Sequence, residues 1–302
     1  RLETIGGLAF SNGTPLTEVV LPDTVTSVGE GSFANNAALT KVHIGAGLTT
    51  SFSILFTGCN NVSELTVSPD NPMYYTSNGE GYSVLFSKME DGLHAVLALP
   101  TNTYTEFTMP EGTVAVDKQA FRNNKTLKKL VLNEGLKKLD TGAFNGCSAL
   151  TDVTFPDSLE YVDGFYSVPD IDPVELGTKV KEVNGNAFMG ANPQHLIIHG
   201  GQNGTYTSSM EFGGKGMQTA YFGTGMASIN YTWGKCPTTI VVPEDMTSLT
   251  LRLYSMGNTG DIMVYAPAKS AGYNNARSGL IAAGLDPSSH LKEYTELGVE
   301  AT

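Results

Sequence analysis

Apolar residues recur along the chain with a regular period of about 23 residues, which lies in the range of known repeat proteins. Two series of phenylalanines mark this period, namely Phe10, Phe33 and Phe56, and then Phe121 and Phe144. Phe188 follows at close to twice this interval. A fixed period is typical of a solenoid, in which each repeat buries its apolar face against its neighbours. The pattern therefore predicts a stack of similar repeats.

Each repeat contains one segment with the periodicity of a β-strand. The positions nine and eleven residues after each phenylalanine are apolar and alternate with other residues, as in a strand. The clearest segments are 19–22, 42–45, 65–68, 130–133 and 153–156. The residues around each phenylalanine predict a short helix or 3₁₀ turn. Strands of neighbouring repeats would lie about 4.8 Å apart and form a sheet that lengthens with each turn.

The strand pattern continues after Phe188, although the regular phenylalanines stop there. Apolar runs begin at residues 174, 196, 220, 240 and 263, and their intervals are close to the same period. We interpret residues 161–267 as degenerate repeats, and residues 1–71 and 107–160 as regular ones.

Residues 72–106 interrupt the period. An Asp91-Gly92 pair lies between two apolar alternating runs, which is typical of a β-hairpin. We expect an inserted hairpin here that projects from the stack or extends it.

A different pattern occupies residues 268–284. This segment is rich in alanine, follows Pro267 and ends at Gly284, as expected for a helix. A solenoid needs a cap at its end, so we expect a helical cap here. The whole forms one domain over 1–284, followed by a C-terminal tail over 285–302.

Charge and hydropathy exclude some classes of partner. The net charge is −12, only 16% of residues are charged, and Lys125, Lys128 and Lys129 form the densest basic cluster. Nucleic acids and anionic membranes normally require a positive patch, so both are disfavoured. No apolar run is long enough for a membrane-spanning helix, which takes about 18 residues or more.

The three cysteines do not predict a disulfide framework. Cys59 and Cys147 each lie three residues after a repeat phenylalanine, and Cys236 is the third. Equivalent positions several repeats apart are too distant to pair, so we expect small buried side chains.

The repeats resemble the BspA-like leucine-rich repeats of bacterial surface antigens. The resemblance is carried by residues 25–48 (VTSVGEGSFANNAALTKVHIGAGL) and 136–159 (LKKLDTGAFNGCSALTDVTFPDSL). Residues 71–100 resemble the hairpin module of this family, and residues 264–273 resemble its closing segment. The resemblance implies an α+β repeat solenoid of the leucine-rich-repeat type. It would have one short strand in each repeat, an inserted β-hairpin and a C-terminal helical cap.

The same resemblance implies an exported protein. Such proteins are secreted or displayed on the surface of gut and oral anaerobic bacteria, and several are associated with adhesion. The chain begins inside a repeat at Arg1. We therefore expect a leader sequence in a longer precursor, with a lipid anchor as one mode of attachment.

No residue pattern predicts catalysis, a metal site or a cofactor. His195 and His199 are four residues apart, but they flank an expected strand, which would separate them by about 13 Å. The run Gly223-Thr224-Gly225 is not followed by a helix, so it predicts a turn rather than a dinucleotide-binding loop. No nucleophile elbow is present. We expect a protein that is not an enzyme.

Two surfaces are candidates for binding. Glu18, Lys41, Glu64, Lys129 and Asp152 each lie eight residues after a phenylalanine, or at the equivalent position. They would form a column on one sheet face, either as cross-strand charge pairs or, together with His43, as a binding face. The second candidate is the aromatic group Tyr206, Tyr231 and Trp233, which would either stack on sugars or fill the core. Lys41, His43 and Lys129 are the site residues expected on the first surface.

The sequence thus favours a secreted or surface-displayed protein that binds proteins of host or neighbouring cells. Glycan capture by the loops of residues 199–262 is one alternative, and a structural spacer is another. We expect a monomer.

Overall fold

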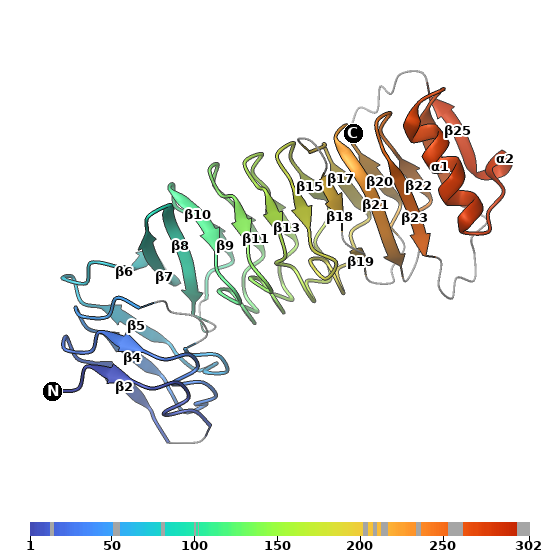
Figure 1. Cartoon of the computed structure of the whole chain (residues 1–302). Coiled ribbons are helices and arrows are strands. Elements are labelled where there is room, and N and C mark those ends of the chain that lie inside the picture. Colours follow the sequence, from blue (N-terminus) through green and yellow to red (C-terminus); the bar gives the residue numbers. More distant parts are fainter. Residues whose placement is uncertain are drawn as a thin grey trace.

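In the computed structural model the chain winds into a solenoid whose turns stack in sequence order (Figure 1). The structure describes residues 1–294 except 13–14, 51–54, 80–81, 100, 102, 202–204, 208–209, 213–216, 234–236 and 253–261. Equivalent backbone groups bond from one turn to the next. The Phe33 N–H donates to the Leu55 carbonyl at 3.2 Å, and the Phe121 N–H donates to the Ala143 carbonyl at 2.7 Å. The predicted solenoid is therefore confirmed.

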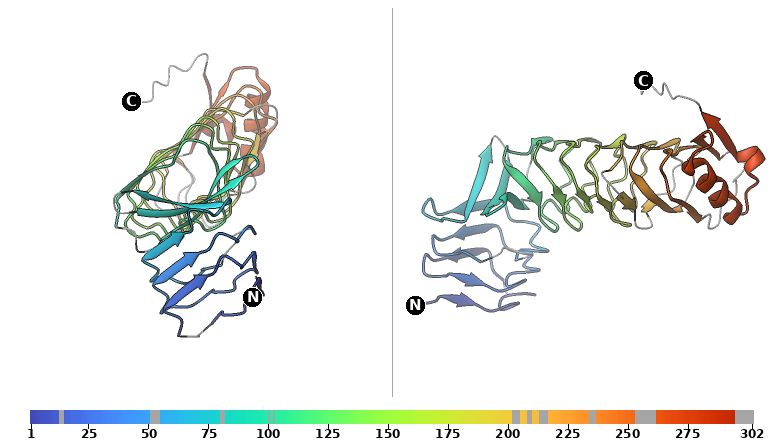
Figure 2. Two further views of the ribbon diagram at one scale, coloured as in Figure 1. Left: turned by 90° about the vertical axis from the view of Figure 1, so that its left-hand side faces the viewer. Right: turned by 45° about the horizontal axis from the view of Figure 1, so that its top comes forward.

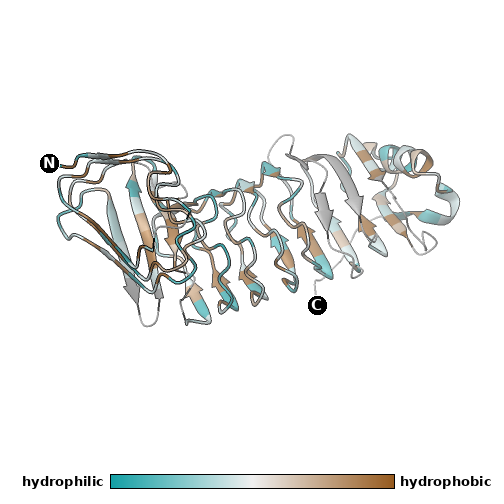
Figure 3. Ribbon diagram, turned by 90° about the horizontal axis from the view of Figure 1, so that it is seen from below, coloured by the Kyte–Doolittle hydropathy of each residue, from teal (hydrophilic) through white to brown (hydrophobic). Residues whose placement is uncertain are grey.

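The predicted strands form parallel sheets along one side of the coil. Val19 pairs with Val42, which pairs with Leu65, and all three side chains are buried. Apolar and polar positions alternate along these strands (Figure 3). The first sheet contains β2 (Glu18–Leu21), β4 (Lys41–Ile44) and β5 (Glu64–Val67). The second contains β9 (Glu106–Thr108), β11 (Lys129–Val131) and β13 (Asp152–Thr154). The third contains β15 (Val174–Leu176), β17 (His195–Ile198), β20 (Thr219–Phe222), β22 (Thr239–Val241), β24 (Met263–Pro267) and β25 (Leu291–Tyr294).

The structure adds a second strand to most turns, on the other side of the coil. In the first turns these strands are β1 (Thr4–Ile5) and β3 (Ser27–Val28). Later turns contribute β10 (Thr113–Val116), β12 (Lys138–Leu139), β14 (Tyr161–Val162), β16 (Glu182–Val183), β18 (Thr205–Thr207), β19 (Met210–Phe212), β21 (Met226–Trp233) and β23 (Ser248–Arg252). Five positions before a stacked phenylalanine, an apolar residue points inward from this strand at Ile5, Val28, Val116, Leu139 and Val183.

The phenylalanines form two stacks inside the coil. The ring of Phe33 lies 5.5 Å from both Phe10 and Phe56, and the ring of Phe144 lies 5.0 Å from Phe121 and 5.1 Å from Phe165. Phe165, which stacks on Phe188 at 5.6 Å, was not predicted as a member, because it follows Phe144 at a shorter interval than the regular period.

We expected a short helix or a 3₁₀ turn in the segments that carry these rings, and the structure has turns there. Bonds between residues three apart, such as that from the Arg122 N–H to the Gln119 carbonyl at 3.0 Å, close them. Asn35 and Asn123 each lie two residues after a phenylalanine and have φ of 60° and 62°. A left-handed residue at this position ends any helical segment, since it costs about 1–2 kcal/mol for an L-residue in a helix. Three turns carry glycine there instead, at Gly58, Gly146 and Gly190.

The predicted hairpin is present and has a third strand. β6 (Tyr74–Gly79), β7 (Tyr82–Met89) and β8 (Gly92–Ala98) form an antiparallel meander, and Met89 pairs with Gly92 across the predicted turn. β8 then pairs in parallel with β10, so the meander extends the stack instead of projecting from it.

The meander separates two hydrophobic cores. Leu85 and Val96 pack into the core of the first turns, while Val84, Phe86 and Ala95 pack into the core of the later turns. A register shift after Leu85 adjusts the alternation of the two strands. The stacking direction changes at this point (Figure 2). We call the turns before the meander the first block and those after it the second block.

The predicted helical cap is α1 (Ala271–Ala282). Ser270 caps its N-terminus by accepting a hydrogen bond from the Tyr273 N–H, and Leu280 is fully buried. A Cβ at Gly272 would overlap the carbonyl oxygen of Pro243, so glycine permits the close approach of the helix to the stack. The segment expected as a tail instead continues the fold. It forms α2 (Pro287–His290) and then β25, which pairs with β24.

Candidate binding surfaces

The predicted charge column is present on the outer face of the first block. β4 lies between β2 and β5, which places Lys41 beside Glu18 and Glu64. The Lys41 Nζ lies 3.1 Å from Glu64 Oε2, and both side chains are 55% exposed. The hydrogen bond and the charge of Glu64 raise the pKa of Lys41. These charges therefore pair across strands while remaining available to a partner.

A second outward row lies beside this column, two residues further along the same strands. His43 Nδ1 lies 2.9 Å from the Thr66 hydroxyl, and Val20 on the other side is 58% exposed. Lys41 and His43 thus lie on one strand of one exposed surface. We call this surface, made of the column and the row on β2, β4 and β5, the β2–β5 face.

Lys129 does not belong to the β2–β5 face, which corrects our expectation of one continuous column. It lies on β11, between Glu106 and Asp152, and its Nζ is 3.9 Å from Asp152 Oδ2. In the described part of the chain this sheet is separate from the first one. The meander lies between them, so the column is interrupted after Glu64.

The three aromatic candidates lie on the opposite side of the coil. Tyr206 is in β18, paired with Ser228, and Tyr231 and Trp233 are in β21, paired with Met210 and Phe212. Their side chains lie outside the described part of the structure. A sugar-binding role for them, and for the loops of 199–262, stays a prediction.

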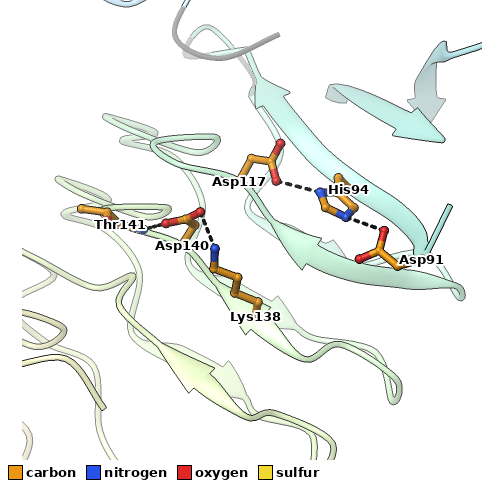
Figure 4. A network of polar contacts seen from close by, with 6 residues as sticks. All are labelled: Asp91, His94, Asp117, Lys138, Asp140 and Thr141. Atoms are coloured by element: carbon orange, nitrogen blue, oxygen red, sulfur yellow. Dashed lines mark hydrogen bonds and ion pairs between the residues drawn. The ribbon is translucent and has the colours of Figure 1, made fainter. Parts of the chain in front are cut away.

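A polar network that sequence reasoning missed lies where the meander joins the second block (Figure 4). The imidazole of His94 lies between two carboxylates, with Nδ1 3.0 Å from Asp117 Oδ1 and Nε2 3.1 Å from Asp91 Oδ1. Its side chain is 18% exposed. The hydrogen bond to Asp117 raises the pKa of His94, Asp91 adds to this, and partial burial opposes it. His94 and Asp117 are one repeat period apart in the sequence, so the period could have revealed the pair.

The same row continues with Asp140, one further period after Asp117. Its carboxylate accepts hydrogen bonds from Lys138 Nζ at 2.8 Å and from the Thr141 N–H at 2.6 Å (Figure 4). Partial burial acts to raise the pKa of Asp140, but the bonds from Lys138 and Thr141 outweigh it and the pKa is lowered. Each of these carboxylates therefore has a hydrogen-bond partner, and the network is a row of paired charged groups along the strands.

We expected that His195 and His199 would not share a metal ion, and in the structure each of them contacts a different carboxylate. His195 Nδ1 lies 3.5 Å from Asp172 Oδ2, and His199 Nε2 lies 2.6 Å from Glu175 Oε1. Within the described residues, no group of three or more His, Cys, Asp or Glu side chains could hold a metal ion.

Two of the cysteines are buried free thiols, as predicted. Cys59 and Cys147 direct Sγ to the carbonyls of Phe33 and Phe121, each at 3.1 Å. Burial raises the pKa of Cys147 to about 12. Cys236 lies outside the described residues. Among the helices of the described part, none has the length and hydropathy to span a membrane.

The repeat geometry agrees with a known family. A family model described as BspA type Leucine rich repeat region matches the chain in six copies, over residues 1–78 and 100–231. The chain belongs to the BspA-type leucine-rich-repeat family. No curated protein matches it in sequence.

Two solved structures share the fold of this BspA-type chain. The pneumococcal vaccine antigen PcpA aligns with a TM-score of 0.66 at 19% identity, covering 97% of this chain and 71% of PcpA. A leucine rich cell surface protein from Faecalibacterium prausnitzii A2-165 aligns with a TM-score of 0.52 at 16% identity. That alignment covers 94% of this chain and 64% of the F. prausnitzii protein, so the chain spans slightly less than two thirds of its length.

Proposed function

We propose that this protein is a non-enzymatic bacterial surface or secreted protein that uses the β2–β5 face to bind a protein on host or neighbouring cells. The observation that carries the proposal is the composition of this face. Exposed Val20 lies beside His43 and the Lys41–Glu64 pair on a rigid parallel sheet. An exposed apolar side chain with polar and charged groups around it offers a partner an apolar contact and a polar rim.

The family and its structural relatives support the setting. One relative is named a cell surface protein and another a vaccine antigen, which suggests that this chain too is exported.

Binding of the purified chain to cultured epithelial cells and to a panel of matrix proteins tests the proposal. A Lys41→Glu, His43→Ala double variant should weaken binding about tenfold or more, as for the loss of interface contacts near a hot spot. Lys179→Glu is the matched control, because Lys179 is a similarly exposed lysine that forms an ion pair with Asp157 in the second block. Lys129→Glu is a third arm that tests the equivalent position of the second block.

Equal binding by the double variant and the unaltered chain would refute the placement on the β2–β5 face. Loss of binding in Lys129→Glu alone would move the site to the second block. No binding by the unaltered chain to any cell or matrix protein would favour a structural spacer.

A further inference from the structure

A cavity lies where the first block, the meander and the second block meet. Its volume is about 180 Å³. The first block contributes the turn from Leu55 to Gly58, the meander contributes the end of β8, and the second block contributes its first phenylalanine turn, 118–123. It is therefore built by three parts of the fold that are distant in sequence.

The cavity lies beside a turn of the repeat that has alanine in place of its phenylalanine. The Ala98 N–H donates to the Ala120 carbonyl at 2.7 Å, in the same way as the Phe121 N–H donates to the Ala143 carbonyl. Ala98 thus occupies the position of a stacked phenylalanine one turn before Phe121. Phe107 stacks on Phe121 instead, with ring centroids 5.6 Å apart. Ala98 lines the cavity together with Phe56 of the first block.

The cavity is basic in an acidic protein. Lys118 and Arg122 line it, both are exposed, and no aspartate or glutamate is among the described residues that line it. The structure gives Lys118 no ion pair within the described residues, and Arg122 Nη1 donates only to Gln119 Oε1, at 3.2 Å. Both cations are therefore available to a ligand, while the chain as a whole has a net charge of −12.

The rest of the rim is rich in side-chain amides. Asn35, Asn60, Gln119 and Asn123 line the cavity, and an amide both donates and accepts hydrogen bonds. Gln119 adopts φ of 61°, whereas two equivalent turns have glycine there, at Gly31 and Gly142, and the first has Leu8. A left-handed glutamine is uncommon and costs free energy. The glutamine at this position provides a side-chain oxygen, Oε1, that accepts the hydrogen bond from Arg122 at the edge of the cavity.

We propose that this cavity binds one carboxylate-bearing sugar residue, such as a uronic or sialic acid unit of a glycan. The planar guanidinium of Arg122 matches a carboxylate, with Lys118 as a second cation. The amides suit the hydroxyl groups of a sugar ring, and Phe56 and Val96 line the apolar part against which its C–H face packs. The volume suits one ring, because drug-sized ligands need about 300 Å³ or more. The inference rests on the proposed surface-binding function and names a second contact for it.

Titration of the ¹⁵N-labelled chain by NMR with three probes tests this assignment. Methyl glucuronide should bind with a dissociation constant of about 1 mM, typical of a ligand of this size. Its shift changes should map to residues 55–60, 96–98 and 118–123. Methyl glucoside has the same ring without the carboxylate and should bind at least tenfold more weakly. N-acetylglutamic acid amide represents an acidic side chain of a protein and should also bind more weakly.

Three variants complete the test. Arg122→Gln should weaken glucuronide binding about tenfold, as for the loss of a charged hydrogen bond. Lys128→Gln, an exposed lysine that does not line the cavity, should leave it unchanged. Ala98→Phe should abolish binding by filling the cavity. The amide spectrum shows whether Ala98→Phe folds. If Ala98→Phe does not fold, the affinity of Arg122→Gln for the glucuronide tests the proposal alone.

Glucoside binding as tight as glucuronide binding, or unchanged affinity in Arg122→Gln, would overturn the proposal. Tighter binding of the glutamate probe would assign the cavity to an acidic peptide and overturn the sugar assignment. None of these results depends on the β2–β5 face. The cell-binding assay with the Lys41→Glu, His43→Ala variant therefore tests the proposed function separately from the sugar-binding cavity.

Discussion

The two hydrophobic cores predict that the two blocks lose stability separately. Phe33 and Phe144 provide a matched pair, because each is buried (3% and 0% exposed) and each stacks between two other rings. Phe33 lies in the first core and Phe144 in the second. Replacing either with alanine removes the same group from a different core.

The expected cost is large relative to the stability of a domain. A buried Phe→Ala substitution costs about 3–5 kcal/mol, and each lost ring pair accounts for about 0.5–1.5 kcal/mol beyond the loss of buried area. A typical domain is stable by about 5–15 kcal/mol. In a solenoid each turn contacts mainly its neighbours, so the loss should remain largely within one block.

Hydrogen exchange followed by mass spectrometry measures this directly. Phe144→Ala should accelerate exchange in β11–β16 and leave β2–β5 nearly unchanged, and Phe33→Ala should do the reverse. Phe10→Ala is the control, since Phe10 is 40% exposed and stacks on Phe33 from the first turn of the chain. It should cost about 1 kcal/mol. Equal acceleration throughout the chain in both core variants would refute the separation of the two blocks.

Three further predictions concern single side chains. Because the folded pKa of His94 is raised, its charged form stabilises the fold fully below the unfolded pKa of about 6.5, and this contribution is lost as pH rises through the folded value. The urea concentration at the midpoint of unfolding should therefore fall in the unaltered chain as the pH rises from about 6.5 through the folded pKa, and it should not fall in His94→Gln. An identical fall in both would contradict the role given to His94. The thiol of Cys147 has a pKa of about 12, so iodoacetamide should not label it in the folded chain and should label it in urea. Rapid labelling of the folded chain would show that this thiol is not buried. The side chain of Asn71 is 4% exposed and forms hydrogen bonds with four backbone groups. Asn71→Leu should therefore lower the free energy of unfolding, measured by urea titration, by about 3 kcal/mol or more. Asn61→Leu, at an exposed site, is the control and should change this free energy little.

The repeat architecture follows from the sequence because its period is a local property. Inward positions such as Val42 and Leu130 recur at fixed distances from each phenylalanine and are buried as predicted. The strand of the repeat that contains Phe165 was predicted, but Phe165 itself was missed because it follows Phe144 at less than the regular period. A solenoid tolerates such changes in its loops, since only the stacked positions must match.

The arrangement of the surfaces could not be predicted in the same way. Placing Lys129 with Lys41 assumed that the stack continues past the meander in one direction. The run of apolar residues 84–86, all buried, was the available signal, because a strand that is apolar at consecutive positions is buried on both faces. The cavity beside Ala98 is also invisible in sequence, since it depends on how three distant segments meet.

The turn-to-turn hydrogen bonds have a mechanical consequence. Bonds such as that from the Phe121 N–H to the Ala143 carbonyl point along the stack, as do the contacts between stacked rings. When the two ends of the solenoid are pulled apart, these contacts lie parallel to the load, and the outermost turn separates first. Each freed turn releases about 80 Å of extended chain. The protein should therefore lengthen under tension in a series of small steps, and absorb a pull instead of breaking at a single peak of force.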